Sequence, residues 1–582
     1  MDKIYVATSV GEMEFSQYAD YQIQLNNVPL NDLKRTYADY VPSDFGIIGD
    51  GVTDDTSNVQ NAFNTMNDGD SIKMKGSYLI KGLITINKAI KVYGKPTFVV
   101  SPSFVYEGGN RLRLFVFAVD GIEFEKVGMS ATGVTYATQD NAFVWATSGK
   151  NKFSKCSFID LPFGGTNFNG GIAFLSGGIG GNIVDKCYFE KCPGGVFTQQ
   201  ANDSIINNLA KNPRDVSFVL NGPNNLGGCI KNNKIYADGS QICAGHIAAE
   251  QGPSNFEIAG NYIYGIKNGY GLGVVDVGGY NVVGVNGLVH DNIVDGNNMV
   301  SVAGQTCLKL DGFYDGIKIY NNIFKNIGSG HPSNSPVELA VTDCDFYNNK
   351  IIQGAGSIGL TINCNGGNID RTKTMRIYRN DINNNNQSWA IKIQDTFPLS
   401  TLKIKDNDIS ASVEGINGVS CVSISELVME NNVYKGVTSP INMVNLESSW
   451  LQNYFNSEGY KHKHLISKTD FDISVANGNA PPTSGTYNPG NKVHIVNPAP
   501  ASYEAQICTT GGVACNVAWV ATTAYIVGNF VYVSNRVYQC TVAGTSGSVA
   551  PSHVSGSATD GTVTWLYVGV LAVFKGMGLI QA

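Results

Sequence analysis

One short pattern of apolar and polar positions recurs through the middle of the chain. An apolar residue is followed by two residues, an Asn or Cys, one residue and a second apolar residue, as in "IKNNKI", "VHDNIV" and "IYRNDI". Most successive copies lie 25 to 31 residues apart, a self-similarity that is typical of a solenoid. The Asn or Cys markers of the copies are Cys156, Cys187, Asn233, Asn261, Asn292, Asn322, Asn349, Asn380, Asn407 and Asn432.

The composition of each repeat favours a parallel β-helix. The units are rich in Asn, Gly and β-branched residues and hold no long stretch of 3.6-residue periodicity, which argues against a helical solenoid. Leu is not the recurring residue, which argues against leucine-rich repeats. Short strands joined by turns at which Asn side chains stack fit the units. We therefore predict an all-β protein built on a single-stranded parallel β-helix, with markers that span on the order of 40 Å.

The marker series has two irregularities, one long step and two positions with Cys in place of Asn. The step from Cys187 to Asn233 is 46 residues, so this stretch holds either an inserted loop or a coil with an unrecognised marker. Where Cys replaces Asn, we expect a small buried side chain at the same place in the coil.

A short helix is predicted just before the first coils, in "SDFGIIGDGVTDDTSNVQNAFN" (residues 43–64). Thr53 is the expected N-cap, with Asp54 and Asp55 in the first turn, where their charge faces the positive end of the helix dipole. The glycines before the helix permit a tight turn. The spacing of the motif fits neither a dinucleotide fingerprint nor a Walker loop nor an EF-hand. The residues predicted on one apolar face are Val59, Ala62, Phe63 and Met66.

Changes in composition divide the chain into four parts. Residues 1–42 precede the helix motif, residues 43–437 form the β-helix, and residues 438–476 form its end cap. After a linker rich in Pro, Gly and Asn, residues 477–582 contain small β-sandwich-like modules. Aromatic residues of the last part either form its core or provide a platform for sugars, and they are Trp519, Tyr525, Tyr532, Tyr538 and Trp565.

Charge and cysteine usage exclude several classes of function. The formal net charge is −7, which argues against a nucleic-acid partner. No apolar run is long enough for a membrane helix, and the N-terminus lacks the apolar region of a secretory signal. The 12 cysteines show no metal-ligand spacing, so we predict neither a metal site nor a cofactor.

The stretch "DFGIIGDGVTDDTSNVQNAF" resembles the opening motif of pectate-lyase-like right-handed parallel β-helix proteins. With the preceding "NNVPLNDLKRTYADYV" and no signal peptide, the chain is similar to bacteriophage tailspike depolymerases, over about residues 25–475. The resemblance implies a homotrimer in the virion, made in the cytoplasm of the bacterial host. Residues 1–42 would link it to phage tail or baseplate proteins, and its substrate would be the capsular polysaccharide of a Gram-negative host. The fold hosts hydrolases, lyases and binding proteins, so the motif indicates the fold more strongly than the activity.

Glycoside hydrolysis requires two carboxyl groups about 5 to 9.5 Å apart, a separation that neighbouring coils of a β-helix supply. Glu250 and Asp311 each lie eleven residues before an Asn marker. Asp276 lies sixteen residues before its marker and needs a longer turn to align. We predict that these three acids form one column of catalytic carboxylates, in which like charges raise one pKa as a general acid requires.

Further residues are predicted to line the substrate groove next to this column, and Tyr270 is expected to stack on sugars. A polysaccharide lyase with His246 or Lys309 as its base is one alternative, and a tail protein that holds glycan without cutting it is another. The predicted substrate-binding residues are His246, Lys309, Tyr314, Glu338, Trp389 and Asp395.

Overall fold

The structure is a computed structural model that resolves into two compact units. The first unit holds Met1–Ser425, Asn431–Glu447 and Phe455–Lys461, and the second holds Glu426–Glu430, Ser448–Tyr454 and His462–Ala582. None of the helices in the described residues is long and apolar enough to cross a membrane. The structure describes residues 5–8, 11–14, 40–106, 111–134, 141–162, 170–240, 245–275, 283–299, 305–311, 314–328, 335–340, 343–353, 358–363, 374–384, 389–394, 399–411, 414–420, 424–436, 439–443, 472–477, 481–496 and 499–580.

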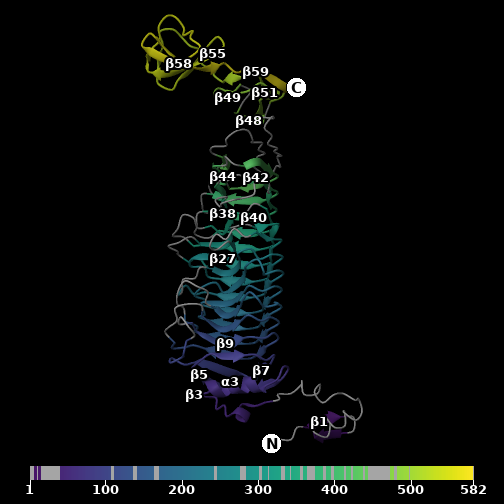
Figure 1. Ribbon diagram of the computed structural model, residues 1–582. Helices are drawn as coiled ribbons and strands as arrows, with labels where there is room; N and C mark the ends of the chain where they lie inside the picture. The colour runs from purple at the N-terminus through teal and green to yellow at the C-terminus, as the bar shows by residue number, and fades with distance from the viewer. Residues whose placement is uncertain are drawn as a thin grey trace. The chain divides into compact units, whose positions relative to one another are not determined.

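The first unit is a right-handed parallel β-helix, as predicted (Figure 1). Its chain passes in turn through three parallel sheets of 14, 15 and 14 strands. The first sheet begins with β4 (Ser71–Lys73), the second with β3 (Asp50–Asp54) and the third with β6 (Ile84–Ile86). Because each strand pairs in parallel with the equivalent strand of the next coil, residues at one register position form a column along the solenoid.

The third sheet carries the candidate site. Its strands after β6 are β9 (Arg113–Phe117), β12 (Ala142–Ala146), β15 (Gly170–Phe174), β18 (Gly194–Thr198), β21 (Phe218–Asn221), β24 (Gly245–Glu250), β27 (Gly269–Val275), β31 (Gln305–Asp311), β35 (Val337–Ala340), β38 (Ile358–Asn363), β41 (Trp389–Gln394), β44 (Glu414–Ser420) and β47 (Ser439–Met443).

Helix α3 (Thr56–Thr65) lies next to the first coils, but its N-terminus differs from the prediction. Thr53 belongs to β3, and Asp55 rather than Thr53 is the N-cap residue. The Asp55 side chain is fully buried and accepts hydrogen bonds from the backbone N–H groups of Ile48 (2.8 Å) and Gly49 (3.0 Å). It therefore stabilises the preceding turn. The predicted apolar face is confirmed, because all of its members are buried: Val59, Ala62, Phe63 and Met66.

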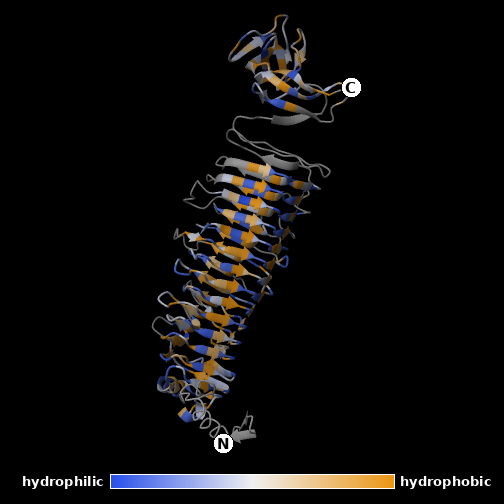
Figure 2. Ribbon diagram, turned by 90° about the vertical axis from the view of Figure 1, so that its right-hand side faces the viewer, coloured by the Kyte–Doolittle hydropathy of each residue, from blue (hydrophilic) through white to orange (hydrophobic). Residues whose placement is uncertain are grey.

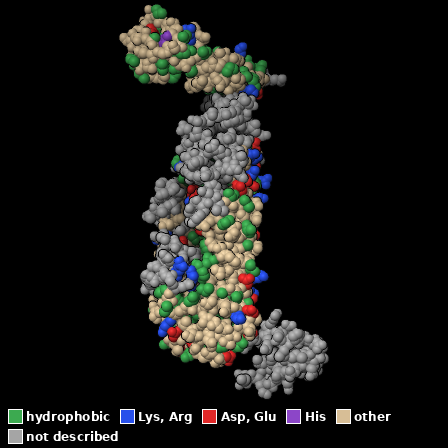
Figure 3. Space-filling view, in the orientation of Figure 1, with side chains coloured by type: hydrophobic (Ala, Val, Ile, Leu, Met, Phe, Trp, Pro, Cys, Tyr) green, Lys and Arg blue, Asp and Glu red, His purple; other side chains and the backbone are tan. Residues whose placement is uncertain are grey.

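Buried apolar side chains fill the solenoid, and the hydrophobic residues colour orange bands along the strands of the ribbon in Figure 2. Aromatic rings dominate the early coils, where Phe98 and Phe115 meet edge to face at 5.0 Å and Phe158 stacks on Phe189 at 4.8 Å. Acidic and basic side chains lie interspersed on the outside (Figure 3), often as ion pairs between neighbouring coils, such as Lys231 with Glu257 at 2.6 Å. The interior thus supplies apolar burial while outward positions are free to vary.

An asparagine ladder runs along the turns between the first and second sheets. From Asn233 onward, the side-chain oxygen of each rung accepts hydrogen bonds from the backbone and side-chain N–H groups of the previous Asn, as Asn322 does from Asn292 at 3.0 and 2.9 Å. Its amide also donates to a backbone carbonyl of the previous coil, Val289 in this case (3.0 Å). Each Asn therefore connects three coils. The ladder members are Asn208, Asn233, Asn261, Asn292, Asn322, Asn349, Asn380, Asn407 and Asn432.

The long gap in the marker series holds a coil and not only an inserted loop. Asn208 provides the missing rung, since its side-chain oxygen accepts from the Cys187 N–H (2.8 Å) and its own N–H donates to Asn233 (2.8 Å). Cys156 and Cys187 are each 2% exposed, so they are the small buried side chains that the pattern predicted.

The second unit contains two four-stranded sheets. The first consists of β48 (Asp472–Asn477), β50 (Lys492–Val496), β51 (Tyr503–Thr510) and β59 (Val573–Leu579). The second consists of β54 (Phe530–Val533), β55 (Arg536–Val542), β58 (Val563–Val570) and β57 (Ser557–Asp560).

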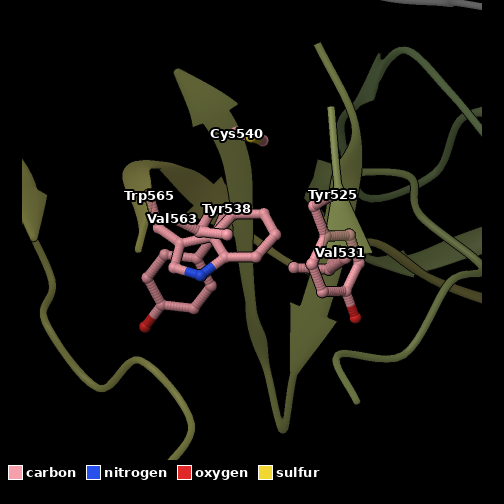
Figure 4. Close-up of a cluster of buried hydrophobic side chains, with 6 residues drawn as sticks. All are labelled: Tyr525, Val531, Tyr538, Cys540, Val563 and Trp565. Atoms are coloured by element: carbon pink, nitrogen blue, oxygen red, sulfur yellow. The ribbon is translucent and has the colours of Figure 1, made fainter. Parts of the chain in front are cut away.

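Aromatic side chains form the core of the second sheet in this unit (Figure 4). Tyr525, Tyr538 and Trp565 are buried, which favours the core interpretation for these three aromatics over a sugar platform. Trp519 is half-buried and packs against the same cluster. The indole N–H groups of Trp519 and Trp565 both donate to one carboxylate oxygen of Asp560, at 2.9 and 3.2 Å.

Candidate active site on the third sheet

Two columns of outward-facing residues define the candidate site. Strand register aligns the first, here called the carboxylate column, from β21 to β35: Asn221, Glu250, Val275, Asp311 and Ala340. Two residues earlier on the same strands, and therefore on the same face of the sheet, lies the lysine column. It consists of Val219, Ala248, Gly273, Lys309, Glu338, Thr361 and Lys392.

Glu250 and Asp311 occupy one register position two rungs apart, as the equal spacing from their markers predicted. The residue between them is Val275, so the prediction that Asp276 fills this rung is wrong. The Asp276 side chain itself lies outside the described residues. Two rungs separate the Cα atoms by about 10 Å, which suits the wider carboxyl separation of inverting glycosidases better than the narrow one of retaining enzymes.

The Glu250 carboxyl group is half-buried beneath an aromatic ring. The Tyr270 hydroxyl donates a hydrogen bond to Glu250 Oε1 at 3.1 Å. The same ring covers the outer face of the sheet so closely that a Cβ atom on Gly245 or Gly273 would lie 2.3 or 2.4 Å from it. Glycine is therefore required at both positions for Tyr270 to reach Glu250.

Burial is the main cause that raises the pKa of Glu250 to about 7, and the negative charge of Asp215 adds to it. Hydrogen bonds from Tyr270 and Asn221 act in the opposite direction, because they stabilise the carboxylate. Burial also raises the pKa of Asp215 above its usual value. Glu250 is thus partly protonated at neutral pH, the state that a general acid needs.

The other half of the site is more polar. Lys309 Nζ lies 3.2 Å from the Asp311 carboxylate, and both side chains are half-buried. Glu338 is the register neighbour of Lys309 in the next coil and is also half-buried. Three charged side chains therefore lie on two neighbouring strands at one end of the carboxylate column.

Two predicted substrate-binding residues lie inside the protein, so that prediction is corrected for both. His246 is fully buried, its Nε2 lies 2.8 Å from the Gly265 carbonyl oxygen, and burial lowers its pKa to about 4. Tyr314 is 1% exposed, and its hydroxyl donates to the Ala249 carbonyl at 3.1 Å. Neither side chain reaches the outer face of the third sheet, so His246 is also removed as the base of a lyase.

Of the two remaining predicted substrate-binding residues, the structure describes Trp389 but not Asp395. Trp389 is half-buried at the start of β41, and the Lys392 Nζ atom lies 4.7 Å from the centre of its ring. Asp395 lies outside the described residues, as do most of residues 1–39 and residues 444–471. Among the described residues, no group of three or more His, Cys, Asp or Glu side chains is placed to hold a metal ion.

Sequence reasoning missed Asp215 and assigned Tyr270 a different role. Asp215 lies in the connection before β21 and not at a register position, so no spacing from a marker could find it. Tyr270 was expected to stack on sugars, whereas the structure shows it 9% exposed and hydrogen-bonded to Glu250. The nearby glycines of "AGHIAAE" and "YGLGVV" were the only sequence signal that a ring lies flat on this sheet.

Comparisons with known proteins agree with the fold. The chain matches the family model described as "Right handed beta helix region" over residues 120–286, a stretch that lies within the parallel β-helix of the first unit. No curated protein matches its sequence.

Several solved structures match this chain at low sequence identity. The N-terminal fragment of gene product 12 of bacteriophage Phi29 is 13% identical, over 79% of this chain and 77% of that chain, with a TM-score of 0.47. Tailspike protein 3 of bacteriophage CBA120 is 10% identical, over 82% and 74%, with a TM-score of 0.41. The A-module of the Azotobacter vinelandii mannuronan C-5 epimerase AlgE6 is 14% identical, over 70% and 96%, with a TM-score of 0.39. These likenesses concern the fold alone.

Proposed function

We propose that the protein is a trimeric phage tailspike that binds the capsular polysaccharide of a Gram-negative host and depolymerises it by glycoside hydrolysis. The observation that carries the catalytic part is the Glu250 carboxyl group, half-buried under Tyr270 with a pKa of about 7 and aligned with Asp311. The tailspike assignment, the trimer and the attachment to the phage tail through residues 1–42 rest on the opening motif at residues 44–63.

The geometry supports an inverting displacement. Protonated Glu250 donates its proton to the glycosidic oxygen while the bond from this oxygen to the anomeric carbon breaks. Asp311 accepts a proton from a water molecule whose oxygen forms the new bond to the same carbon from the opposite side. The products are two shorter chains, one with a new reducing end, and exchange of protons with solvent restores both carboxyl groups.

The other outward-facing groups have supporting roles in this proposal. Lys309 holds the Asp311 carboxylate in place through their ion pair, and Glu338 and Trp389 provide further contacts for the glycan. Asp215 and Tyr270 are positioning residues, because they act on the substrate only through Glu250.

A lyase is the second candidate function, and the positions of Lys309 and His246 decide which of them could act as its base. Lys309 lies on the outer face beside Asp311, whereas His246 is inside the solenoid. A lyase on this site would therefore use Lys309 as the base that removes a proton next to a uronate carboxyl group.

Product analysis tests the proposal. The purified protein is incubated with a panel of bacterial capsular polysaccharides, and reducing ends, unsaturated sugars and polymer length are measured. Hydrolysis gives new reducing ends without unsaturation. Unsaturated ends that absorb ultraviolet light would establish the lyase instead, and retained but intact polymer would establish a glycan receptor.

Substitution of the two acids tests the site. Glu250→Gln and Asp311→Asn should each lower kcat/KM by about 10²- to 10⁴-fold while glycan binding is retained. Glu190→Gln is a matched control, because Glu190 also accepts a hydrogen bond from a tyrosine, Tyr188 at 2.7 Å, but belongs to the second sheet. Full activity in either catalytic variant, or equal losses in the control, would rule out this column.

A further inference from the structure

The lysine column continues beyond the candidate site to a second pair of outward-facing side chains. Register connects Lys309 through Glu338 and Thr361 to Lys392, three strands further along the third sheet. Three rungs correspond to about 14 Å along the solenoid. Trp389 lies on the same strand, and its ring is close to the Lys392 ammonium group, with Nζ 4.7 Å from the ring centre. A glycan that lies along this face from Asp311 would therefore reach both side chains.

Lys392 differs from Lys309 in its charge balance. Lys309 is paired with Asp311 at 3.2 Å, whereas among the described residues Lys392 forms no ion pair, and its ammonium group lies over the neutral indole of Trp389. Lys392 is half-buried, and burial lowers its pKa. A partly desolvated ammonium group without a negative partner gains free energy when an anion binds beside it.

The indole adds orientation to this charge. A cation–π contact holds the ammonium group in one place before a ligand arrives, so less side-chain freedom is lost on binding. The half-buried Trp389 also presents apolar surface next to the charge. Apolar ring surface beside a fixed positive charge is complementary to a sugar that carries a negative group.

We infer that Trp389 and Lys392 form a subsite for a carboxylate-bearing sugar, so that the protein selects acidic polysaccharides. This inference rests on the proposed function for the direction in which the glycan lies. It adds the class of substrate and a specificity-determining residue, Lys392, that is separate from the residues of bond cleavage.

A glycan array tests the inference without depending on cleavage. The probes are acidic bacterial capsular polysaccharides, the same polymers after chemical reduction of their carboxyl groups, and neutral dextran. Wild-type protein should bind at least one acidic polymer and lose about tenfold or more in affinity when the carboxyl groups are reduced. Lys392→Gln should show the same loss on the native polymer, whereas Lys392→Arg should keep most of the affinity, because it keeps the charge.

Lys318→Gln is the control, since Lys318 is an exposed lysine on β33 (Ile317–Tyr320) of the first sheet. Unchanged affinity of Lys392→Gln, equal binding of native and reduced polymers, or binding of no acidic polymer would each overturn the subsite. The two proposals fail differently. Lys392-dependent binding without new chain ends would contradict cleavage alone, and Glu250-dependent cleavage that is equal in Lys392→Gln would contradict the subsite alone.

Discussion

The asparagine ladder and the outer face of the third sheet run along the same solenoid, but the ladder keeps one residue type from coil to coil and the outer face does not. The ladder repeats one residue with the same hydrogen bonds in coil after coil, and its members are buried. The lysine column changes at each rung, from Ala248 and Gly273 to Lys309 and Glu338. In this fold, repetition therefore indicates a requirement of the stack, and a break in repetition indicates where function is located.

The difference has an energetic basis. A buried Asn in the ladder satisfies backbone groups of neighbouring coils, so every coil needs one. Within the described residues, the side chains of Glu250, Lys309 and Asp311 hydrogen-bond to other side chains and not to backbone groups of the stack, since the strands pair through their own main chains. Glu250 even opposes folding at neutral pH, because burial disfavours its charged form. The half-buried Glu250 carboxyl group therefore costs stability at neutral pH, which is the physical reason for proposing a functional role for it.

The largest expected effect comes from removing one rung of the ladder. Asn322→Ala removes the acceptor of the buried Asn292 backbone and side-chain N–H groups and a donor to the Val289 carbonyl oxygen. Because each buried unsatisfied group is costly, we expect a loss of roughly 3 to 5 kcal/mol in the free energy of unfolding. Urea denaturation followed by circular dichroism measures it.

Asn322→Cys is the internal comparison for this experiment. Cys occupies the marker position in two native coils, and the Cys156 thiol donates to the Phe124 carbonyl at 3.3 Å. The Cys variant should therefore lose less than the Ala variant. Equal stability of Asn322→Ala and the wild-type protein would show that the ladder is not what fixes the coils.

A smaller effect on stability is expected in a second, shorter ladder of buried polar side chains, in which the native residue at one rung is an Asp and not an Asn. At the turns between the third and first sheets, the Asn151 N–H donates to Asn182 (3.0 Å), and the Asn182 N–H donates to Asp203 (2.8 Å). Asp203 is 1% exposed, and burial raises its pKa to about 6 although Thr198 and Asn182 donate hydrogen bonds to it.

Asp203→Asn should therefore stabilise the protein at high pH. The folded-state pKa lies above the ordinary value of 3.8, so the contribution of Asp203 to stability is complete below about pH 4 and is lost as the pH rises through 6. A shift of about two pKa units corresponds to roughly 3 kcal/mol. Urea midpoints at pH 4 and pH 8 should separate the variant from wild type only at pH 8. Asp185→Asn, in the partly exposed strand β16 (Ile183–Asp185), should show no such difference. If the urea midpoint of Asp203→Asn differed from that of wild type equally at both pH values, burial of the Asp203 charge would not be the cause.

Much of the fold could be predicted from the sequence because the ladder is periodic. The rung at Asn208 escaped detection in the sequence because Ala210 follows it where other coils have Ile, Val, Phe or Tyr, and Ala is a weak apolar signal. The sequence also left unexplained why Asn, Asp or Gly so often precedes the marker. The structure shows this residue in the left-handed region, as at Asn232 and Asp291 (φ 55° and 56°), where these residue types are least strained.

The site was predicted less completely because register and facing depend on contacts between coils. Equal spacing from the markers aligned Glu250 with Asp311, whereas Asp276, sixteen residues before its marker, was added on the assumption of a longer turn, and Val275 is the aligned residue. A shift of one residue moves a side chain to the other face of a sheet. Because the loop before a marker varies in length, counting residues from the marker cannot detect such a shift. His246 was misplaced for a related reason, since it and its neighbour Ile247 are both fully buried and simple alternation fails there.

The smallest expected effect is a change in the cleavage rate with pH, which corresponds to about 1.4 kcal/mol in activation free energy per pH unit. It tests whether Glu250 acts in catalysis, unlike the residues of the asparagine ladder. If Glu250 is the general acid, its protonated form is the active one, and its pKa is raised to about 7 by burial and Asp215. The cleavage rate should then be constant just below this value and fall tenfold per pH unit above it. Asp215→Asn removes a charge that raises this pKa, so the alkaline limb should begin at lower pH with the maximal rate nearly unchanged. Measurement of kcat/KM from pH 5 to pH 9 on the cleaved polymer shows both. A rate that stays constant to pH 9, or a limb that Asp215→Asn does not move, would assign the acid to another residue and leave Glu250 with a structural role like that of the ladder.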